Sequence, residues 1–205
     1  MIYSPEKFTV TDREALLQLI RENSFATLIV GNGGDPMVAH IPVLLDEKSG
    51  VLRAHVARAN PLWQQLRPDH EVLLIFHGPH HYISPSCYNV HPSVPTWNYA
   101  VVHVHGLPAI IEDTAKVESM LRALVQANES KAQSPWQMKL PDDYLKKMIG
   151  AIVAFEVRVS RMQGKFKLSQ NRPAIDRANV VAALEQAGND DAGRLAALMR
   201  QIVEL

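Results

Sequence analysis

A succession of β-strand patterns, several of them joined by tight turns, limits how this chain folds more than any other feature. Strands are expected over residues 25–30, 37–45, 51–57, 71–77, 81–84, 100–111 and 149–159. The glycine-rich residues 31–35 separate the first two as a strong turn signal. The regular alternation of strands with helices that builds a parallel sheet does not occur. The order therefore predicts a mainly β fold, a small antiparallel barrel with peripheral helices.

Helical patterns lie at the ends of the chain and between groups of strands. They are expected over residues 12–22, 114–128, 174–187 and 191–204, with a short helix opened by Asn60 and Pro61. A capping box opens the first helix, since Thr11 can cap it and Glu14 can reach back. We expect a barrel domain over residues 1–172 and a helical extension over 173–205 packed on it.

Composition narrows the classes of protein that this chain can belong to. Its 205 residues are 47% hydrophobic, which is enough for a core. The 21 acidic and 21 basic side chains give a net charge of zero, which disfavours a chain-wide electrostatic footprint for nucleic acid. There is one cysteine, and we find neither a membrane-length apolar run nor a signal-peptide pattern. We expect a cytoplasmic protein without a membrane segment.

Two stretches carry side chains that a core alone would not need. In residues 94–106, Trp97, Asn98 and Tyr99 run directly into a β-branched strand. This mixture can stack on a planar ligand and hydrogen-bond to its edge. The second stretch, residues 165–172, is rich in lysine, amide and arginine side chains. Together they suggest a pocket for a flat, polar, anionic ligand, with ordinary solvated charge as the alternative for the basic residues.

A candidate anion site lies where the strand over 51–57 meets the following helix. His55, Arg58 and Asn60 lie at this junction. A helix N-terminus presents free N–H groups to anions, and an arginine can bind phosphate with two hydrogen bonds. The alternative is an asparagine that caps the helix beside an exposed arginine.

The histidines and the cysteine do not form a recognised catalytic or metal motif. His77, His80 and His81 cluster in the sequence, and His103 and His105 fall on one face of an expected strand, but HExxH and paired cysteines are absent. We therefore predict no metal site and interpret these histidines as hydrogen-bonded groups in or beside a barrel pocket. The single cysteine is interpreted as a small buried residue.

Five segments in order resemble the PaiB family, the FMN-binding negative transcriptional regulators of bacteria. They are Ala39-His-Ile-Pro-Val43, His55-Val-Ala-Arg-Ala-Asn-Pro61, Tyr82-Ile-Ser-Pro-Ser86, Val94-Pro-Thr-Trp-Asn-Tyr99 and Lys165-Phe-Lys-Leu-Ser-Gln-Asn171. The resemblance covers nearly the whole chain. One departure is Cys87, where the family pattern has a tryptophan.

The resemblance implies a split β-barrel similar to pyridoxamine-phosphate oxidase, and a homodimer with FMN at the subunit interface. It places the flavin phosphate near His55, Arg58 and Asn60. It also places two further groups around the flavin. These are Trp97, Asn98 and Tyr99 near the ring system or the dimer seam, and Lys165, Gln170 and Arg172 closing the pocket.

Several functions stay open at this stage. The resemblance implies a repressor, but the sequence shows no convincing helix-turn-helix, and Asp190 and Asp191 would repel phosphate at the C-terminal helices, so direct DNA binding has weak support. The alternatives are a flavin-dependent oxidoreductase, and a haem-binding or haem-degrading barrel with His103 or His105 as ligand. A barrel that has lost its cofactor is a third class. Whether the protein is an enzyme is left undecided.

Overall fold

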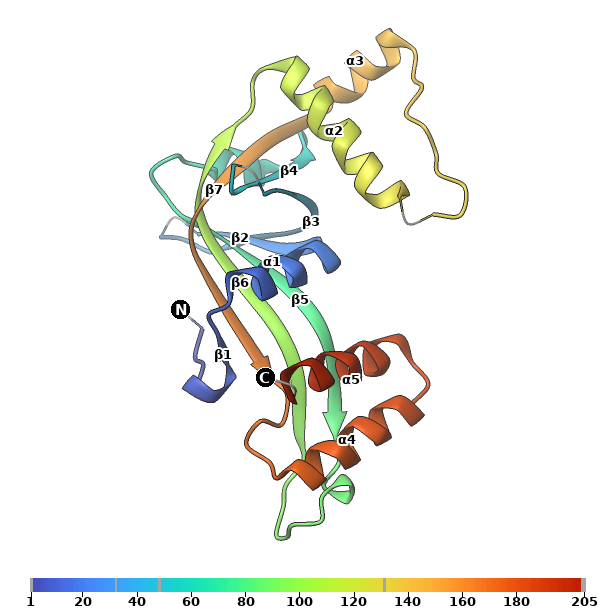
Figure 1. Ribbon diagram of the computed structural model, residues 1–205. Helices are drawn as coiled ribbons and strands as arrows, with labels where there is room; N and C mark the ends of the chain where they lie inside the picture. Colours follow the sequence, from blue (N-terminus) through green and yellow to red (C-terminus); the bar gives the residue numbers. More distant parts are fainter. Residues whose placement is uncertain (1, 32, 48, 131, 204–205) are drawn as a thin grey trace. The chain divides into compact units, whose positions relative to one another are not determined.

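The fold is an antiparallel β-barrel with helices, seen in a computed structural model that describes residues 2–31, 33–47, 49–130 and 132–203. Strands are joined in the order β1-β7-β4-β3-β2-β5-β6, and a further pairing of β7 with β6 closes a barrel of six strands, to which β1 is added. The path of these strands can be followed in Figure 1. The expected mainly β, antiparallel barrel with peripheral helices is confirmed.

The elements have the following bounds. The strands are β1 (Thr9–Val10), β2 (Phe25–Val30), β3 (Met37–Asp46), β4 (Val51–Ala57), β5 (Val72–Ile83), β6 (Thr96–Ile110) and β7 (Ile152–Lys167). The α-helices are α1 (Arg13–Glu22), α2 (Thr114–Glu129), α3 (Asp142–Gly150), α4 (Ala174–Gln186) and α5 (Asp190–Val203). The short 3-10 helices are η1 (Glu6–Phe8), η2 (Pro61–Gln65) and η3 (Pro85–Cys87). Within the described residues, no helix is both long enough and apolar enough to cross a membrane.

The chain divides into two compact units, which we describe separately. The terminal unit comprises Met1–Leu19, His77–Val102 and Gln163–Leu205. The central unit comprises Ile20–Phe76 and His103–Met162. Strands β5, β6 and β7 contribute residues to both units.

Strict alternation along the strands builds the core of the central unit. Leu52, Ala54 and Val56 of β4 are buried, and each lies opposite a buried residue of β7. The residues between them point to the other face of the sheet, because neighbouring side chains in a strand point in opposite directions. His55 on that face pairs with Ala154, which belongs to the apolar cluster made by α2.

Gly106 allows β6 to approach β7 closely within the central unit. A Cβ atom at this position would lie 2.5 Å from the carbonyl oxygen of Arg158 and 2.6 Å from Cγ1 of Val157. Real side chains do not tolerate these distances, so only glycine fits without a shift of the backbone.

The terminal unit combines strand ends with the C-terminal helices. Thr9 of β1 pairs with Lys165 of β7. Helices α4 and α5 lie side by side (Figure 1) and bury apolar side chains that include Val180, Leu184, Leu195 and Met199. The amphipathic patterns at the end of the sequence therefore correspond to two packed helices.

Several boundaries differ from those that the sequence predicted. The two expected strands over 71–77 and 81–84 form the single strand β5, because Pro79 lies beyond the three residue pairs that join β5 to β2, where a missing N–H is tolerated. The last strand continues to Lys167, well past the expected end at residue 159. Helix α3 and the short strand β1 were not expected.

The cap of α1 also differs from the prediction. Asp12, and not Thr11, accepts hydrogen bonds from the backbone N–H groups of Glu14 and Ala15, at 3.3 and 3.2 Å. The helix begins at Arg13, so Asp12 is the residue at the N-cap position. Parts of three predictions lie outside the described residues: Asn32 in the turn over residues 31–35, Lys48 in a turn that the sequence also indicates over residues 48–50, and residue 204 at the end of the last helix.

Candidate functional site

An exposed aromatic cluster lies on β5 and β6 in the terminal unit. The ring centroids of Trp97 and Tyr82 are 6.0 Å apart in an edge-on arrangement, and those of Trp97 and His80 are 6.2 Å apart. Trp97 is 51% exposed and Tyr82 is 46% exposed. Large aromatic side chains at such exposure on neighbouring strands present ring faces to a ligand or partner.

Lys165 brings a positive charge to the same unit. Its ammonium group donates a hydrogen bond of 2.8 Å to the backbone carbonyl of Tyr3. The same nitrogen lies 5.4 Å from the ring centroid of Tyr3 and 5.6 Å from that of Tyr99. Tyr99 points to the same side of β6 as Trp97, because residues two apart on a strand share a face. Cationic and aromatic groups therefore occur together on β6 and β7.

Lys167 is the second lysine of this group. Its ammonium donates to the carbonyl of Trp97 at 2.9 Å and to the hydroxyl of Thr96. Burial lowers the pKa of Lys167 below its ordinary value, and the neighbouring charge of Lys165 lowers it further. These contacts fix the start of β6, and with it the backbone from which Trp97 projects.

Asn98 lies inside the protein, unlike its two neighbours. It is fully buried, and its amide nitrogen donates to the Ser169 hydroxyl at 2.8 Å and to the Met199 sulfur at 3.6 Å. Ser169 has a φ of 63°, so the turn after β7 passes through the left-handed region at this residue. Asn98 thus links β6 to that turn and to α5. Because Asn98 lies between Trp97 and Tyr99 in β6, its hydrogen bonds hold the stretch of backbone that carries both rings.

Gln170 shapes the turn that follows β7. Its side-chain nitrogen donates to the carbonyl of Phe166 at 2.6 Å, and its side-chain oxygen accepts from the N–H of Leu168 at 2.7 Å. Both bonds are local, so the amide closes the turn on itself.

Arg172 joins this turn to the loop before β6. Its guanidinium carbon lies 4.0 Å from the centroid of the Tyr88 ring, and Nη1 donates to the Ser93 hydroxyl at 3.0 Å. The six predicted residues of the terminal unit thus come from two segments, the start of β6 and the end of β7 with its turn.

The other three predicted residues belong to the central unit. Arg58 donates from Nε to the carbonyl of Gly150 at 2.7 Å and from Nη2 to that of Ile152 at 2.8 Å, which caps the end of α3. The short helix expected after Asn60 is the 3-10 helix η2, and the Asn60 side chain accepts from the N–H of Leu62 at 3.0 Å. Two donor groups of Arg58 and one N–H of the helix start are therefore engaged within the protein.

His55 carries a buried polar atom without a partner. Among the described residues, none hydrogen-bonds to its Nδ1. Burial lowers the pKa of His55 below its ordinary value of 6.5. The neutral ring is therefore the favoured form in the folded protein.

The free energy of unfolding is expected to fall as the pH drops below about 6.5, because the unfolded chain then binds a proton that half-buried His55 binds only at lower pH. Above this pH the contribution of His55 is fully present. Denaturant unfolding at about pH 7.5 and about pH 5.5 measures the effect. His55→Gln should reduce the loss of stability on acidification, and His91→Gln, at an exposed loop histidine, is the control. An unchanged difference between the two pH values in His55→Gln would contradict this expectation.

A small pocket lies beside α2 in the central unit, with a volume of about 240 Å³. Arg53 lines it and is paired with Asp46 at 2.9 Å and with Glu156 at 3.6 Å. The charge of Arg53 is therefore largely neutralised by carboxylates.

Some candidate residues were missed by the sequence analysis as site residues. His80, Tyr82 and Tyr3 join the aromatic and cationic group, and Lys167 anchors its backbone. Tyr82 lies in a segment that resembles the family, and its two-residue spacing from His80 was the available signal. In the described part of the chain, no three histidine, cysteine, aspartate or glutamate residues are grouped so that they could hold a metal ion.

The barrel architecture defines the class of protein. Solved structures with this fold include the FAD and haem binding protein from Mycobacterium smegmatis, with a TM-score of 0.63, 16% identity and coverage of 89% of this chain and 80% of that one. They also include the flavocytochrome Anf3 from Azotobacter vinelandii, with a TM-score of 0.61, 16% identity and coverage of 83% and 75%. The fold is thus a split β-barrel of the kind found in flavin-binding proteins.

The sequence comparisons establish the family. The family described as "Putative FMN-binding domain" matches residues 2–161, and the chain belongs to it. A relative from Bacillus subtilis (strain 168), "Protease synthase and sporulation protein PAI 2", is 35% identical over 202 residues, which cover 97% of this chain and 96% of that protein. The family that the sequence resembled is therefore confirmed, and FMN is the cofactor assigned to it.

The side chains of the terminal unit fit the chemistry of FMN. The ring faces of Trp97 and Tyr82 suit a planar ring system, and the positive charge of Lys165 suits an anionic ligand. When bound, FMN supplies redox chemistry that protein side chains lack.

Proposed function

We propose that this protein is an FMN-dependent negative transcriptional regulator that holds the flavin against the aromatic and cationic face of β6. The proposal rests on one observation above the others. The exposed ring of Trp97 is packed edge-on against Tyr82, on the strand face that also carries Tyr99 beside Lys165. Membership of the FMN-binding family supports a flavin as the planar ligand for this face.

The proposed roles of the residues follow their surroundings. Trp97 and Tyr99 contact the ring system, and Lys165 neutralises negative charge on the ligand. Asn98, Gln170 and Arg172 position them by holding the start of β6 and the turn after β7. In the central unit, His55, Arg58 and Asn60 are proposed phosphate ligands, with Nη1 of Arg58 lying outside its two bonds to α3.

A homodimer is part of the proposal. Trp97 at 51% exposed and Val94 at 71% exposed are large apolar side chains on adjoining segments. Exposed large apolar side chains of this kind support an interface with a second copy of the chain. The mass of the purified protein by light scattering tests this directly, and a strictly monomeric protein would count against it.

Family membership and the similarity to the Bacillus subtilis relative support the proposed role in transcriptional regulation. Two measurements test this role. The first is a titration of the purified protein with FMN, followed by quenching of flavin fluorescence, with one flavin bound per chain as the expected result. The second is a gel shift with the protein's own promoter fragment, with and without FMN and at two salt concentrations. FMN-dependent binding to this fragment, and not to a scrambled one, is expected.

The outcomes separate the parts of the proposal. Absence of FMN binding at high micromolar concentration would overturn the flavin site. FMN binding without any DNA binding would overturn the regulator. Rapid NAD(P)H oxidation by the flavin-loaded protein would then favour a flavin-dependent oxidoreductase.

A further inference from the structure

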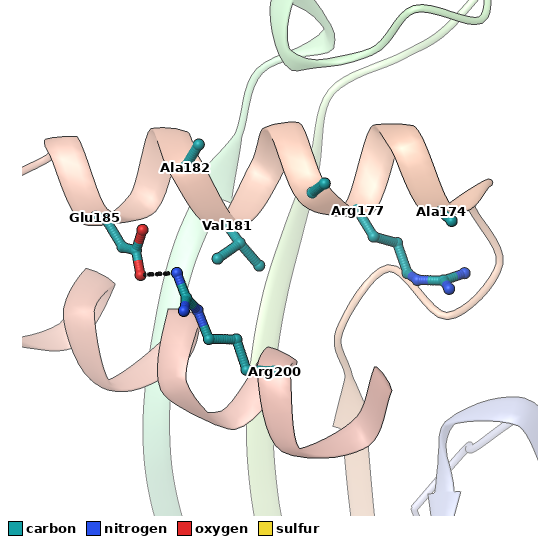
Figure 2. Close-up of a pocket in the computed structure, with 7 residues that line it drawn as sticks. Ala174, Arg177, Val181, Ala182, Glu185 and Arg200 are labelled. Carbon is teal, nitrogen blue, oxygen red and sulfur yellow. Dashed lines mark hydrogen bonds and ion pairs between the residues drawn. The ribbon is translucent and has the colours of Figure 1, made fainter. Parts of the chain in front are cut away.

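A groove between α4 and α5 forms a pocket that is separate from the aromatic and cationic face. Its volume is about 370 Å³, within the range of small-molecule sites. It is lined by Ala174, Arg177, Ala178, Val181, Ala182, Glu185 and Arg200. Figure 2 shows Val181 projecting into the space between the two helices, with charged side chains on either side of it.

The charges at the two ends of this groove differ. At one end Arg200 of α5 is paired with Glu185 of α4 at 2.5 Å, so these two charges cancel. At the other end, Nη1 of Arg177 donates to the carbonyl of Arg172 at 2.7 Å. Within the described residues, no carboxylate is ion-paired with Arg177. The lining therefore carries one excess positive charge, on a guanidinium that a backbone contact already holds in place.

The wall between the charged ends is apolar. Val180 and Leu184 face the core, yet the outer side of α4 carries exposed Ile175, Ala178 and Ala182. A surface helix is usually polar on the side away from the core, so exposed apolar residues on this side of α4 indicate a surface that an apolar ligand can cover. Arg177 and Glu185 are eight residues apart on α4, about 12 Å along the helix axis.

We propose that this groove binds a small monocarboxylate with an apolar body, such as a medium-chain fatty acid. The carboxylate pairs with Arg177, and the apolar chain lies along Ala178, Val181 and Ala182 toward the Arg200–Glu185 pair. One negative charge on the ligand balances the one excess positive charge of the lining. A cationic or uncharged ligand of the same length would cover Arg177 and leave its charge without a partner. Removing an unpaired charge from water is unfavourable, so such a ligand should bind more weakly.

Titration of the full-length protein with octanoate by calorimetry tests this site, with octan-1-ol and octylammonium as matched probes. Saturable binding of octanoate is expected, with clearly weaker binding of both other probes. Arg177→Gln should weaken octanoate binding by about tenfold or more, because a charge-assisted hydrogen bond is lost. Glu185→Gln should leave saturable octanoate binding in place, because Glu185 pairs with Arg200 at the end of the groove away from Arg177.

A matched pair of variants separates the groove from general surface binding. Ala178→Leu fills the groove and should abolish octanoate binding. Ala183→Leu introduces the same side chain at an exposed α4 position outside the lining and should leave binding unchanged. Leucine is a good helix former, so both variants should keep the helical signal in circular dichroism.

Three results of these titrations would overturn the proposal, and a competition experiment adds a fourth. They are absence of saturable octanoate binding, equal binding of octan-1-ol, and equal loss in Ala178→Leu and Ala183→Leu. Competition between octanoate and FMN would also overturn it, because it would place the carboxylate in the flavin site. The proposal does not depend on FMN binding, since octanoate is titrated without flavin.

Discussion

Trp97→Ala is expected to weaken FMN binding by about tenfold to a hundredfold, which is the range for loss of one aromatic stacking partner. The indole is half exposed and touches Tyr82 and His80 through its ring. Its backbone carbonyl, which accepts from Lys167, is kept in the variant. The change should therefore remove stacking surface with little effect on the free energy of unfolding. Quenching of flavin fluorescence measures the affinity.

Trp136→Ala is the matched control for this experiment. Trp136 is also 51% exposed, but it lies in the central unit, in the loop between α2 and α3. Its replacement should leave the FMN affinity unchanged, and Trp97→Phe should restore much of the affinity that Trp97→Ala loses. FMN binding by Trp97→Ala with wild-type affinity would show that the flavin does not stack on this residue.

Asn98→Ala is expected to lower the free energy of unfolding by about 2–4 kcal/mol. The change removes a buried hydrogen bond, leaves the Ser169 hydroxyl with no Asn98 partner, and opens a cavity beside Met199. Equilibrium unfolding in urea measures this loss.

A double-mutant cycle with Ser169→Ala assigns the loss to its cause. If the Asn98–Ser169 contact carries much of the effect, the double variant should be more stable than the sum of the two single losses implies. Simple additivity would mean that the cost arises from the cavity alone. Full stability of Asn98→Ala would contradict the proposed positioning role.

The sequence predicted the strands well where the pattern was local. Leu52, Ala54 and Val56 alternate with more polar residues, and this spacing by itself indicates a strand with one buried face. It predicted strand ends less well, because β7 continues through residues 160–163, whose exposed or half-buried side chains break the apolar pattern. Pairing with β1 at Lys165 keeps this segment extended, and that pairing joins residues far apart in the chain.

For the candidate site, too, the sequence predicted some features and not others. The residue types of Trp97, Tyr99 and Lys165 suggested a planar, anionic ligand before any fold was known. The hydrogen-bond partners of the site residues could not be predicted from the sequence. Asn98 bonds to Ser169, which is 71 positions away, and Arg58 bonds to Gly150, which is 92 positions away. Contacts at such separations depend on how the strands are ordered in the barrel.

The sequence by itself determined the class of this protein: a mainly β antiparallel barrel with C-terminal helices, and membership of an FMN-binding family. These conclusions depend on periodicity, turn residues and short motifs, all of which are local properties of the chain. Only the tertiary structure decided that Asn98 is buried while Trp97 beside it is exposed, and that Arg58 caps α3. Burial and hydrogen-bond partners depend on segments that meet in space. Two residues that are adjacent in the sequence, such as Trp97 and Asn98, can therefore lie in different surroundings.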